Sequence, residues 1–213
     1  MEIIHEKVKK VQRINDTSPI SPSSLFVETT TKIFLIKPEN EDTFTPRVNF
    51  CYEFHLEAAR NGVFYCTKML TNTADFILLH NDSIVLIKRK HEPFKGCLAL
   101  PGGFVDEGEN PIDAAVRELN EEVNIKIQKE FLTPVVVQSK PFRDPRNKWT
   151  TAHVFTATVE DLSSIKAGDD ADSYIILPLS ELSNQNLAFD HLESIKLCFD
   201  KYADLRAELK TLF

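Results

Sequence analysis

The stretch from Gly102 to Ile125 limits the possible folds of this chain more than any other segment. It begins with the turn signal Pro101-Gly102-Gly103, directly after an apolar run, which predicts a short strand that ends just before the turn. After a polar loop, Asn110 stands as an N-cap and Pro111 as the first helical residue, where its missing N–H costs nothing. The spacing predicts a helix to about Val123, with one apolar face that packs on a core.

Three glutamates of this helix, Glu118, Glu121 and Glu122, stand at i, i+3 and i+4, so their side chains converge on one patch. Their like charges repel, and the macrodipole disfavours anions in the second half of a helix. Arg117 can pair with Glu121 and relieve one of them. An ordinary solvated helix face is one interpretation. The other is a site for Mg²⁺ or Mn²⁺, because clustered carboxylates are hard oxygen ligands that suit these ions.

The same stretch resembles the signature of the Nudix hydrolase family, G-x5-E-x7-R-E-U-x-E-E-x-G-U, in which U is aliphatic. The residues that match at the required spacing are Gly103, Glu109, Arg117, Glu118, Leu119, Glu121, Glu122 and Ile125. The last glycine of the signature is replaced by Asn124. That position follows the helix, where a left-handed residue is required, and Asn is the usual substitute for Gly there. The resemblance implies an α/β fold, the Nudix α/β/α sandwich with a mixed sheet.

The resemblance covers roughly residues 71–200, so we expect a Nudix hydrolase domain over 71–213 and an N-terminal subdomain over 1–70. Residues 1–23 resemble an arm or a loosely packed lead-in. Strands are predicted from β-branched and apolar residues at 25–37, 48–56 and 62–70, which makes this subdomain largely extended. It carries no motif that indicates a function, and we expect it to pack on the core or to build a homodimer.

The second domain is predicted to begin with a hairpin of residues 75–80 and 83–89 around the turn Asn81-Asp82. Further strands are expected at 132–137, 150–159 and 173–177, with a helical turn at 178–182. A final amphipathic helix follows the stretch 187–191 and continues to about Leu212.

The resemblance implies how the glutamate patch holds metal. Glu118 and Glu122 would be the principal ligands of Mg²⁺ or Mn²⁺, and Glu121 would be a further ligand or the base. The main-chain carbonyl of Gly102 or Gly103 would add an oxygen. Glutamates placed against local helix stability are then explained by metal binding.

The resemblance also implies catalytic roles. Arg117 would orient a glutamate rather than contact substrate. In relatives that act on ADP-ribose the general base can be an acid outside the signature, and Asp169 and Asp170 are the candidates here. These two residues can equally serve only to form a turn.

Three softer features resemble the ADP-ribose-directed branch of the family: FRDPR at 142–146, AGDDA at 167–171 and LAFDH at 187–191. The last of them can also be a helix N-terminus capped by Asp190. The implied reaction is hydrolysis of ADP-ribose to AMP and ribose 5-phosphate. A nucleoside diphosphate sugar, NADH or an oxidised nucleotide would keep the chemistry and change the substrate. A non-catalytic ADP-ribose sensor is the alternative from another class, and the intact glutamates argue against it.

The candidate substrate-binding residues are aromatic and cationic. Phe142 suits a base, and Arg143 and Arg146 in the same loop suit phosphate or carboxylate. Arg89 lies in a short basic run that can face substrate phosphate or form a solvated edge protecting a strand.

The net charge of −7 argues against nucleic acid as the main partner and fits a protein that needs metal ions to handle phosphates. The four cysteines have no paired spacing, which favours reduced thiols. We find no signal-peptide run and no segment long enough to span a membrane, so a cytoplasmic location is expected.

Overall fold

The computed structural model describes residues 2–13, 25–29, 31–36, 51–59, 63–146, 149–167 and 171–202. Its contacts divide the chain into two compact units, one of which is Met1–Asn72 with Val105–Glu109 and Ser139–Thr151. The other contains Thr73–Phe104, Asn110–Gln138 and Ala152–Phe213. The domain boundary placed between residues 70 and 71 from the sequence stays a prediction.

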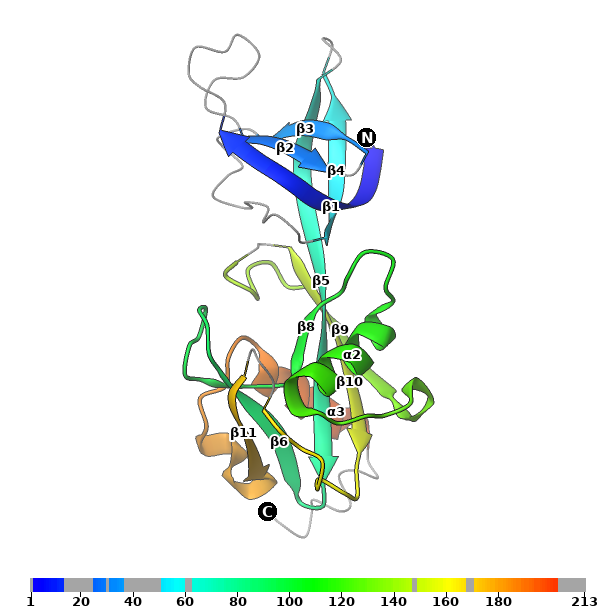
Figure 1. Ribbon diagram of the computed structural model, residues 1–213. Coiled ribbons are helices and arrows are strands. Elements are labelled where there is room, and N and C mark those ends of the chain that lie inside the picture. The colour runs from blue at the N-terminus through cyan, green and yellow to red at the C-terminus, as the bar shows by residue number, and fades with distance from the viewer. Residues whose placement is uncertain are drawn as a thin grey trace. The chain divides into compact units, whose positions relative to one another are not determined.

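The first unit is built from extended strands, as the sequence predicts (Figure 1). They are β1 (Glu2–Arg13), β2 (Leu25–Thr29), β3 (Ile33–Ile36), β4 (Cys51–Ala58) and the first part of β5 (Phe64–His80). Strand β1 pairs antiparallel with β2 and β4, β2 pairs with β3, and β5 pairs with both β3 and β4. The pairing therefore closes on itself around an apolar interior that includes Phe34, Phe54 and Met69.

Strand β1 corrects one sequence-based expectation, because residues 2–13 form a paired strand and not a loose arm. Ile4, Glu6 and Val8 alternate toward the interior, and Glu6 is buried because it accepts hydrogen bonds from the backbone and hydroxyl of Thr31. A register shift between Val8 and Lys10 then interrupts the alternation. A bulge of this kind hides the two-residue period that identifies a strand in a sequence.

Strand β5 is one strand of 17 residues, where the sequence indicated two separate ones at 62–70 and 75–80. The polar residues between them, Thr71 and Thr73, are buried within the strand. Threonine is β-branched and fits a pleated strand, so its polarity is a poor indicator of a chain break.

Within the described residues, the second unit holds the remaining strands of the mixed sheet and the helices α2 and α3. The strands are β6 (Ser83–Arg89), β7 (Leu98–Ala99), β8 (Gly102–Phe104), β9 (Thr133–Gln138), β10 (Thr150–Thr158) and β11 (Ala171–Pro178). The helices are α2 (Pro111–Val123) and α3 (His191–Lys201), with short 3-10 turns η1 (Lys129–Phe131) and η2 (Leu179–Asn184). The predicted hairpin is confirmed, since His80 pairs with Ser83 around Asn81, whose φ is 48°.

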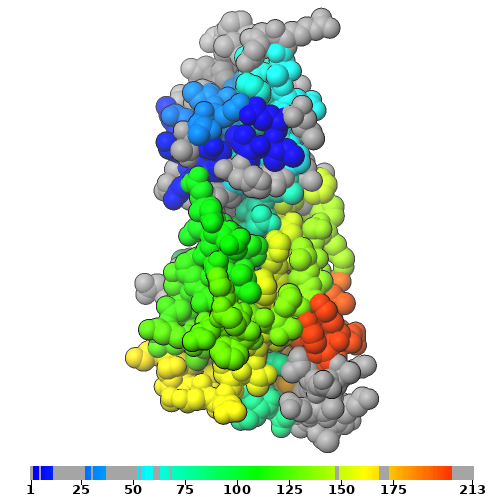
Figure 2. Space-filling view, turned by 90° about the vertical axis from the view of Figure 1, so that its right-hand side faces the viewer, coloured from blue at the N-terminus to red at the C-terminus, as the bar shows by residue number. Residues whose placement is uncertain are grey.

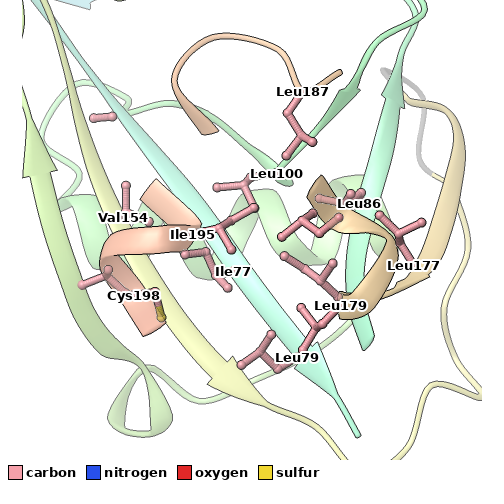
Figure 3. Packing of buried hydrophobic residues seen from close by; sticks show 14 residues of the cluster. Ile77, Leu79, Leu86, Leu100, Val154, Leu177, Leu179, Leu187, Ile195 and Cys198 are labelled. Atoms are coloured by element: carbon pink, nitrogen blue, oxygen red, sulfur yellow. The ribbon is translucent and has the colours of Figure 1, made fainter. Parts of the chain in front are cut away.

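Helices α2 and α3 cover opposite faces of this sheet (Figures 1 and 3). On the α3 face, Ile77 packs in one buried cluster with Leu100 and Ile195. The intervening residues Phe76 and Leu78 are also buried, and because side chains alternate along a strand they face α2. Burial on both faces gives the α/β/α sandwich that the resemblance implies. The part of the chain that the structure describes contains no helix long and apolar enough to cross a membrane.

A pocket of about 500 Å³ lies between the start of α2 and strands β9 and β10, and His153 and Lys201 line it. Burial lowers the pKa of His153, because the charged imidazolium is disfavoured away from water. In the unfolded chain this histidine titrates near its ordinary value of 6.5. As the pH falls through that value, the unfolded chain therefore binds a proton before the folded chain does, and stability is lost.

We expect the free energy of unfolding to fall between about pH 7.5 and about pH 5.5, and His153→Gln to reduce that fall. Urea denaturation of both proteins at the two pH values measures the effect. An equal loss of stability in the wild type and the variant would show that another group is responsible.

Candidate active site

The loop that leads into α2 is held against strand β5 by backbone hydrogen bonds. Strand β8 pairs antiparallel with β5, which places Gly102 opposite Asp75 and Gly103 opposite Ala74. The N–H of Phe76 donates to the carbonyl of Pro101 at 2.8 Å. These bonds fix the two glycines at the edge of the sheet, immediately before the helix that carries the glutamates.

Both glycines are required by close approach. Gly102 has a φ of +154°, and a Cβ there would lie 2.4 Å from the carbonyl oxygen of Ala74. A Cβ on Gly103 would lie 2.1 Å from Oε1 of Glu118. The loop therefore contacts the glutamate patch directly, and the space that a side chain would take at Gly103 is occupied by a carboxylate.

Each of the three glutamates has a different environment. Glu122 is buried, and its Oε2 accepts the N–H of Gly102 at 2.8 Å. The side chain of Glu118 is 14% exposed, and that of Glu121 is 56% exposed. Solvent exposure therefore increases across the patch, from the buried carboxylate of Glu122 beside the loop to that of Glu121 in solvent.

Arg117 pairs with two of the glutamates. Its Nη1 lies 2.7 Å from Oε1 of Glu118 and 3.2 Å from Oε2 of Glu121, while Nη2 donates to the carbonyl of Phe104 at 2.9 Å. The predicted pairing of Arg117 with Glu121 is confirmed. The expectation that only one glutamate is relieved was wrong, because the guanidinium also reaches the neighbouring Glu118. The role predicted for it, orienting a carboxylate, stays a prediction.

The donors of this site suit a hard divalent cation. Among the residues that the structure describes, no three Asp, Glu, His or Cys side chains already form a coordination sphere. Here Glu118 and Glu121 pair with Arg117, and Glu122 accepts the N–H of Gly102. The carboxylate of Glu118 nevertheless lies directly against the loop backbone, in the space that a side chain at Gly103 would take. That set of oxygen donors fits Mg²⁺ or Mn²⁺.

Helix α2 ends as the sequence predicts. Asn124 has φ 56° and ψ 32°, the left-handed conformation that the family's glycine would supply. Its side chain also donates to the carbonyl of Ser164 at 2.7 Å, and the N–H of Lys166 donates to Val123. The segment after β10 therefore lies against the end of the helix (Figure 2, yellow beside green). A glycine could not make the side-chain bond.

The loop from Lys140 to Trp149 belongs to the first compact unit. Asp144, which the sequence did not single out, is buried and binds the guanidinium of Arg146, with Nη2 2.6 Å from Oδ2. Phe142 is 61% exposed with a φ of 62°. The substrate-binding roles predicted for Phe142, Arg143 and Arg146 stay predictions.

The remaining candidates are Asp169, Asp170 and Arg89. Asp169 and Asp170 lie outside the described residues. The Nε of Arg89 donates to the carbonyl of Pro93 at 2.8 Å, and its guanidinium lies 4.9 Å from the ring centroid of Phe189. Arg89 is thus engaged with the LAFDH stretch, and its predicted contact with phosphate is untested.

The chain is similar to known proteins of one family. A family model described as NUDIX domain matches residues 69–198. The ADP-ribose pyrophosphatase of Methanocaldococcus jannaschii is 44% identical over 122 residues, which cover 57% of this chain and 69% of that protein. The ADPR responsive transcriptional repressor NtrR of Acinetobacter baylyi is 28% identical over 72% of this chain and 62% of its own length.

A solved structure also matches. The bifunctional NMN adenylyltransferase/ADP ribose pyrophosphatase of Francisella tularensis, complexed with AMP and a manganese ion, superposes with a TM-score of 0.57 and 32% identity. The match covers 63% of this chain and 42% of that one, so the chain spans less than half of that protein.

Proposed function

Because the chain belongs to the Nudix family of pyrophosphohydrolases, in its ADP-ribose pyrophosphatase branch, we propose that it hydrolyses ADP-ribose in a reaction that depends on Mg²⁺ or Mn²⁺. Water adds to one phosphorus, the bridging P–O bond breaks, and the products are AMP and ribose 5-phosphate, with a proton released. The observation that carries the proposal is the contact between the loop and two glutamates, Glu118 over Gly103 and Glu122 on the N–H of Gly102.

The chain's own residues have distinct tasks in this proposal. Glu118, Glu121 and Glu122, with the carbonyl of Gly102 or Gly103, would hold the ion. A bound Mg²⁺ or Mn²⁺ supplies positive charge that offsets the repulsion between the pyrophosphate and an incoming nucleophile. Arg117 is anchored on Phe104 and holds two of the carboxylates in place.

The proton of the attacking water needs an acceptor within hydrogen-bond reach. Glu121 is the candidate on the helix, since it is the most exposed of the three glutamates. Asp169 and Asp170 are the candidates outside it. Activity of each Asn or Gln variant as a function of pH distinguishes them, because loss of the base removes the acid limb of the profile.

Substrate recognition is assigned to the loop from Lys140 to Trp149 and to Arg89. Phe142 exposes its ring and is proposed to contact the base, and Arg143 to contact phosphate or the terminal ribose. Arg146 binds Asp144 and Arg89 donates to the carbonyl of Pro93. For these two cations we propose a contact with the substrate phosphates.

The substrate is tested by comparing kcat/KM for ADP-ribose, a nucleoside diphosphate sugar, NADH and an oxidised nucleoside triphosphate, with products resolved by chromatography. We expect ADP-ribose to be preferred and to yield AMP with ribose 5-phosphate in equal amounts. A higher kcat/KM for another compound would replace ADP-ribose as the substrate and leave the chemistry in place.

A non-catalytic ADP-ribose sensor is the second candidate, and the similarity to the repressor NtrR supports it. The two functions differ in one observable: a sensor binds ADP-ribose without releasing AMP. Calorimetric binding combined with product analysis on the same sample separates them. All three glutamates of the signature, Glu118, Glu121 and Glu122, are present, which favours the enzyme because these carboxylates can hold a divalent ion.

We further propose that the chain acts as a homodimer in the cytoplasm, without nucleic acid as a partner. Cys66, Cys97 and Cys198 form no disulfide in the part of the chain that the structure describes, as expected for a reducing compartment. The net charge of −7 disfavours binding to phosphate backbones. Sedimentation at micromolar concentration tests the dimer, and a monomer there would refute it.

A further inference from the structure

The stretch Leu187–His191 runs beside the strand that leads into the glycine loop. Leu187 forms a parallel bridge with Leu98, and the N–H of Ala188 donates to the carbonyl of Leu98 at 2.8 Å. Figure 3 shows Leu187 and Ile195 of the following helix on the same side as Leu100. The residues before α3 therefore fix, through backbone contacts, the position of the chain segment immediately ahead of Gly102.

One hydrogen bond to this segment is made by a side chain. The N–H of Leu100 donates to Nδ1 of His191 at 2.9 Å, and both residues are buried. Because Nδ1 accepts this bond it carries no proton, so the neutral imidazole carries its proton on Nε2. Nε2 lies 3.9 Å from Oδ2 of Asp75, which is also buried. Asp75 thus favours the tautomer that leaves Nδ1 free to accept.

The bond to His191 is the first of three that fix successive residues of the loop. The N–H of Leu100 is held by His191, the carbonyl of Pro101 by Phe76, and the N–H of Gly102 by Glu122. Two of the three partners are side chains from distant parts of the sequence. Together they set where the carbonyls of Gly102 and Gly103 point.

We propose that His191, oriented by Asp75, is a positioning residue for the metal-binding loop. It holds Leu100 so that the glycine carbonyls and the carboxylate of Glu122 stay in register as ligands. This assignment rests on the proposed function, since it presumes that the loop and the glutamates bind a divalent ion. It also gives LAFDH a role other than helix capping, because Asp190 stands at the N-cap without a side-chain capping bond.

The test compares His191→Leu with His191→Asn in the full chain. Leucine fills similar space but cannot accept a hydrogen bond, whereas Oδ1 of asparagine can take the place of Nδ1. Binding of Mn²⁺ is measured by titration, with the electron paramagnetic resonance signal reporting the unbound ion. We expect the leucine variant to bind Mn²⁺ about tenfold more weakly, as for other groups that orient metal ligands. The asparagine variant should remain within about twofold of the wild type, since its acceptor is restored.

The possible results distinguish the role of His191 from the existence of the metal site. Wild-type binding equal to that of the leucine variant, or equal weakening in both variants, would overturn the role of the acceptor. A wild type that does not bind Mn²⁺ would refute the metal site itself. Nitrogen NMR of the wild-type imidazoles needs no variant: a proton on Nδ1 of His191 would overturn the inference even if the leucine variant fails to fold.

Discussion

Replacing Glu122 by glutamine is expected to lower kcat/KM for the substrate by about 10²–10³-fold, the cost of removing one preorganised charge from an active site. The change exchanges one oxygen for an NH₂ group. The amide keeps a carbonyl oxygen that can still accept the N–H of Gly102, so the loop can remain in place. What is lost is the negative charge of a buried carboxylate beside the loop.

The matched control is Asp113→Asn on the same helix. Asp113 is exposed, pairs with Lys129 at 2.9 Å, and stands in the first turn of the helix, whereas Glu122 stands near its end. The substitution makes the same change of charge and chemistry, and we expect kcat/KM within about twofold of wild type, as for a surface ion pair. Equal activity in Glu122→Gln and the control would remove Glu122 from the site.

Alanine substitutions at the two neighbouring glycines are expected to have different effects: Gly103→Ala lowers activity, and Gly102→Ala lowers stability. In Gly103→Ala the new methyl group would meet the carboxylate of Glu118, which is the mobile end of a side chain and can move away. Stability should therefore change little. Displacement of a ligand by about 1 Å can lower activity by about 10²-fold, and we expect a loss of that order.

In Gly102→Ala the methyl group would meet backbone, at 2.4 Å from the oxygen of Ala74 and 2.8 Å from Cα of Asp75. Backbone in a sheet cannot move away as a side chain can, so we expect destabilisation of about 3 kcal/mol. For a chain of this size that lowers the melting temperature by roughly 6–12 °C. Calorimetry and kinetics on both variants test the contrast. A Gly103→Ala protein with full activity, or one as unstable as Gly102→Ala, would contradict it.

The elements decided by local chemistry were predicted from the sequence. Asn110, Pro111 and Asn124 bound α2 as expected, because the ends of a helix depend on residues within a turn of them. The hairpin at Asn81 was predicted for the same reason. The bulge within β1 and the buried threonines within β5 depend on pairing with other strands. For this reason the predictions of a loose arm and of two separate strands were wrong.

In the candidate site too, features within one helix could be predicted from the sequence, and contacts between distant segments could not. The spacing of Glu118, Glu121 and Glu122 is visible in the sequence because one helix carries all three. The bond of Glu122 to Gly102 spans 20 residues and that of His191 to Leu100 spans 91, and no periodicity reports such contacts. The LAFDH stretch was the available signal for the second bond, but its chemistry becomes clear only when α3 is placed beside Leu100.

The measurement that tests the central claim most directly is the release of AMP from ADP-ribose by the wild-type chain as Mg²⁺ or Mn²⁺ is titrated into metal-free protein. We expect no AMP without the ion, a saturable rise in AMP as the ion is added, and one ribose 5-phosphate for each AMP. Release of AMP at full rate in the presence of a chelator would contradict the metal-dependent mechanism. Folded protein that yields no AMP at any concentration of either ion would contradict the hydrolysis of ADP-ribose.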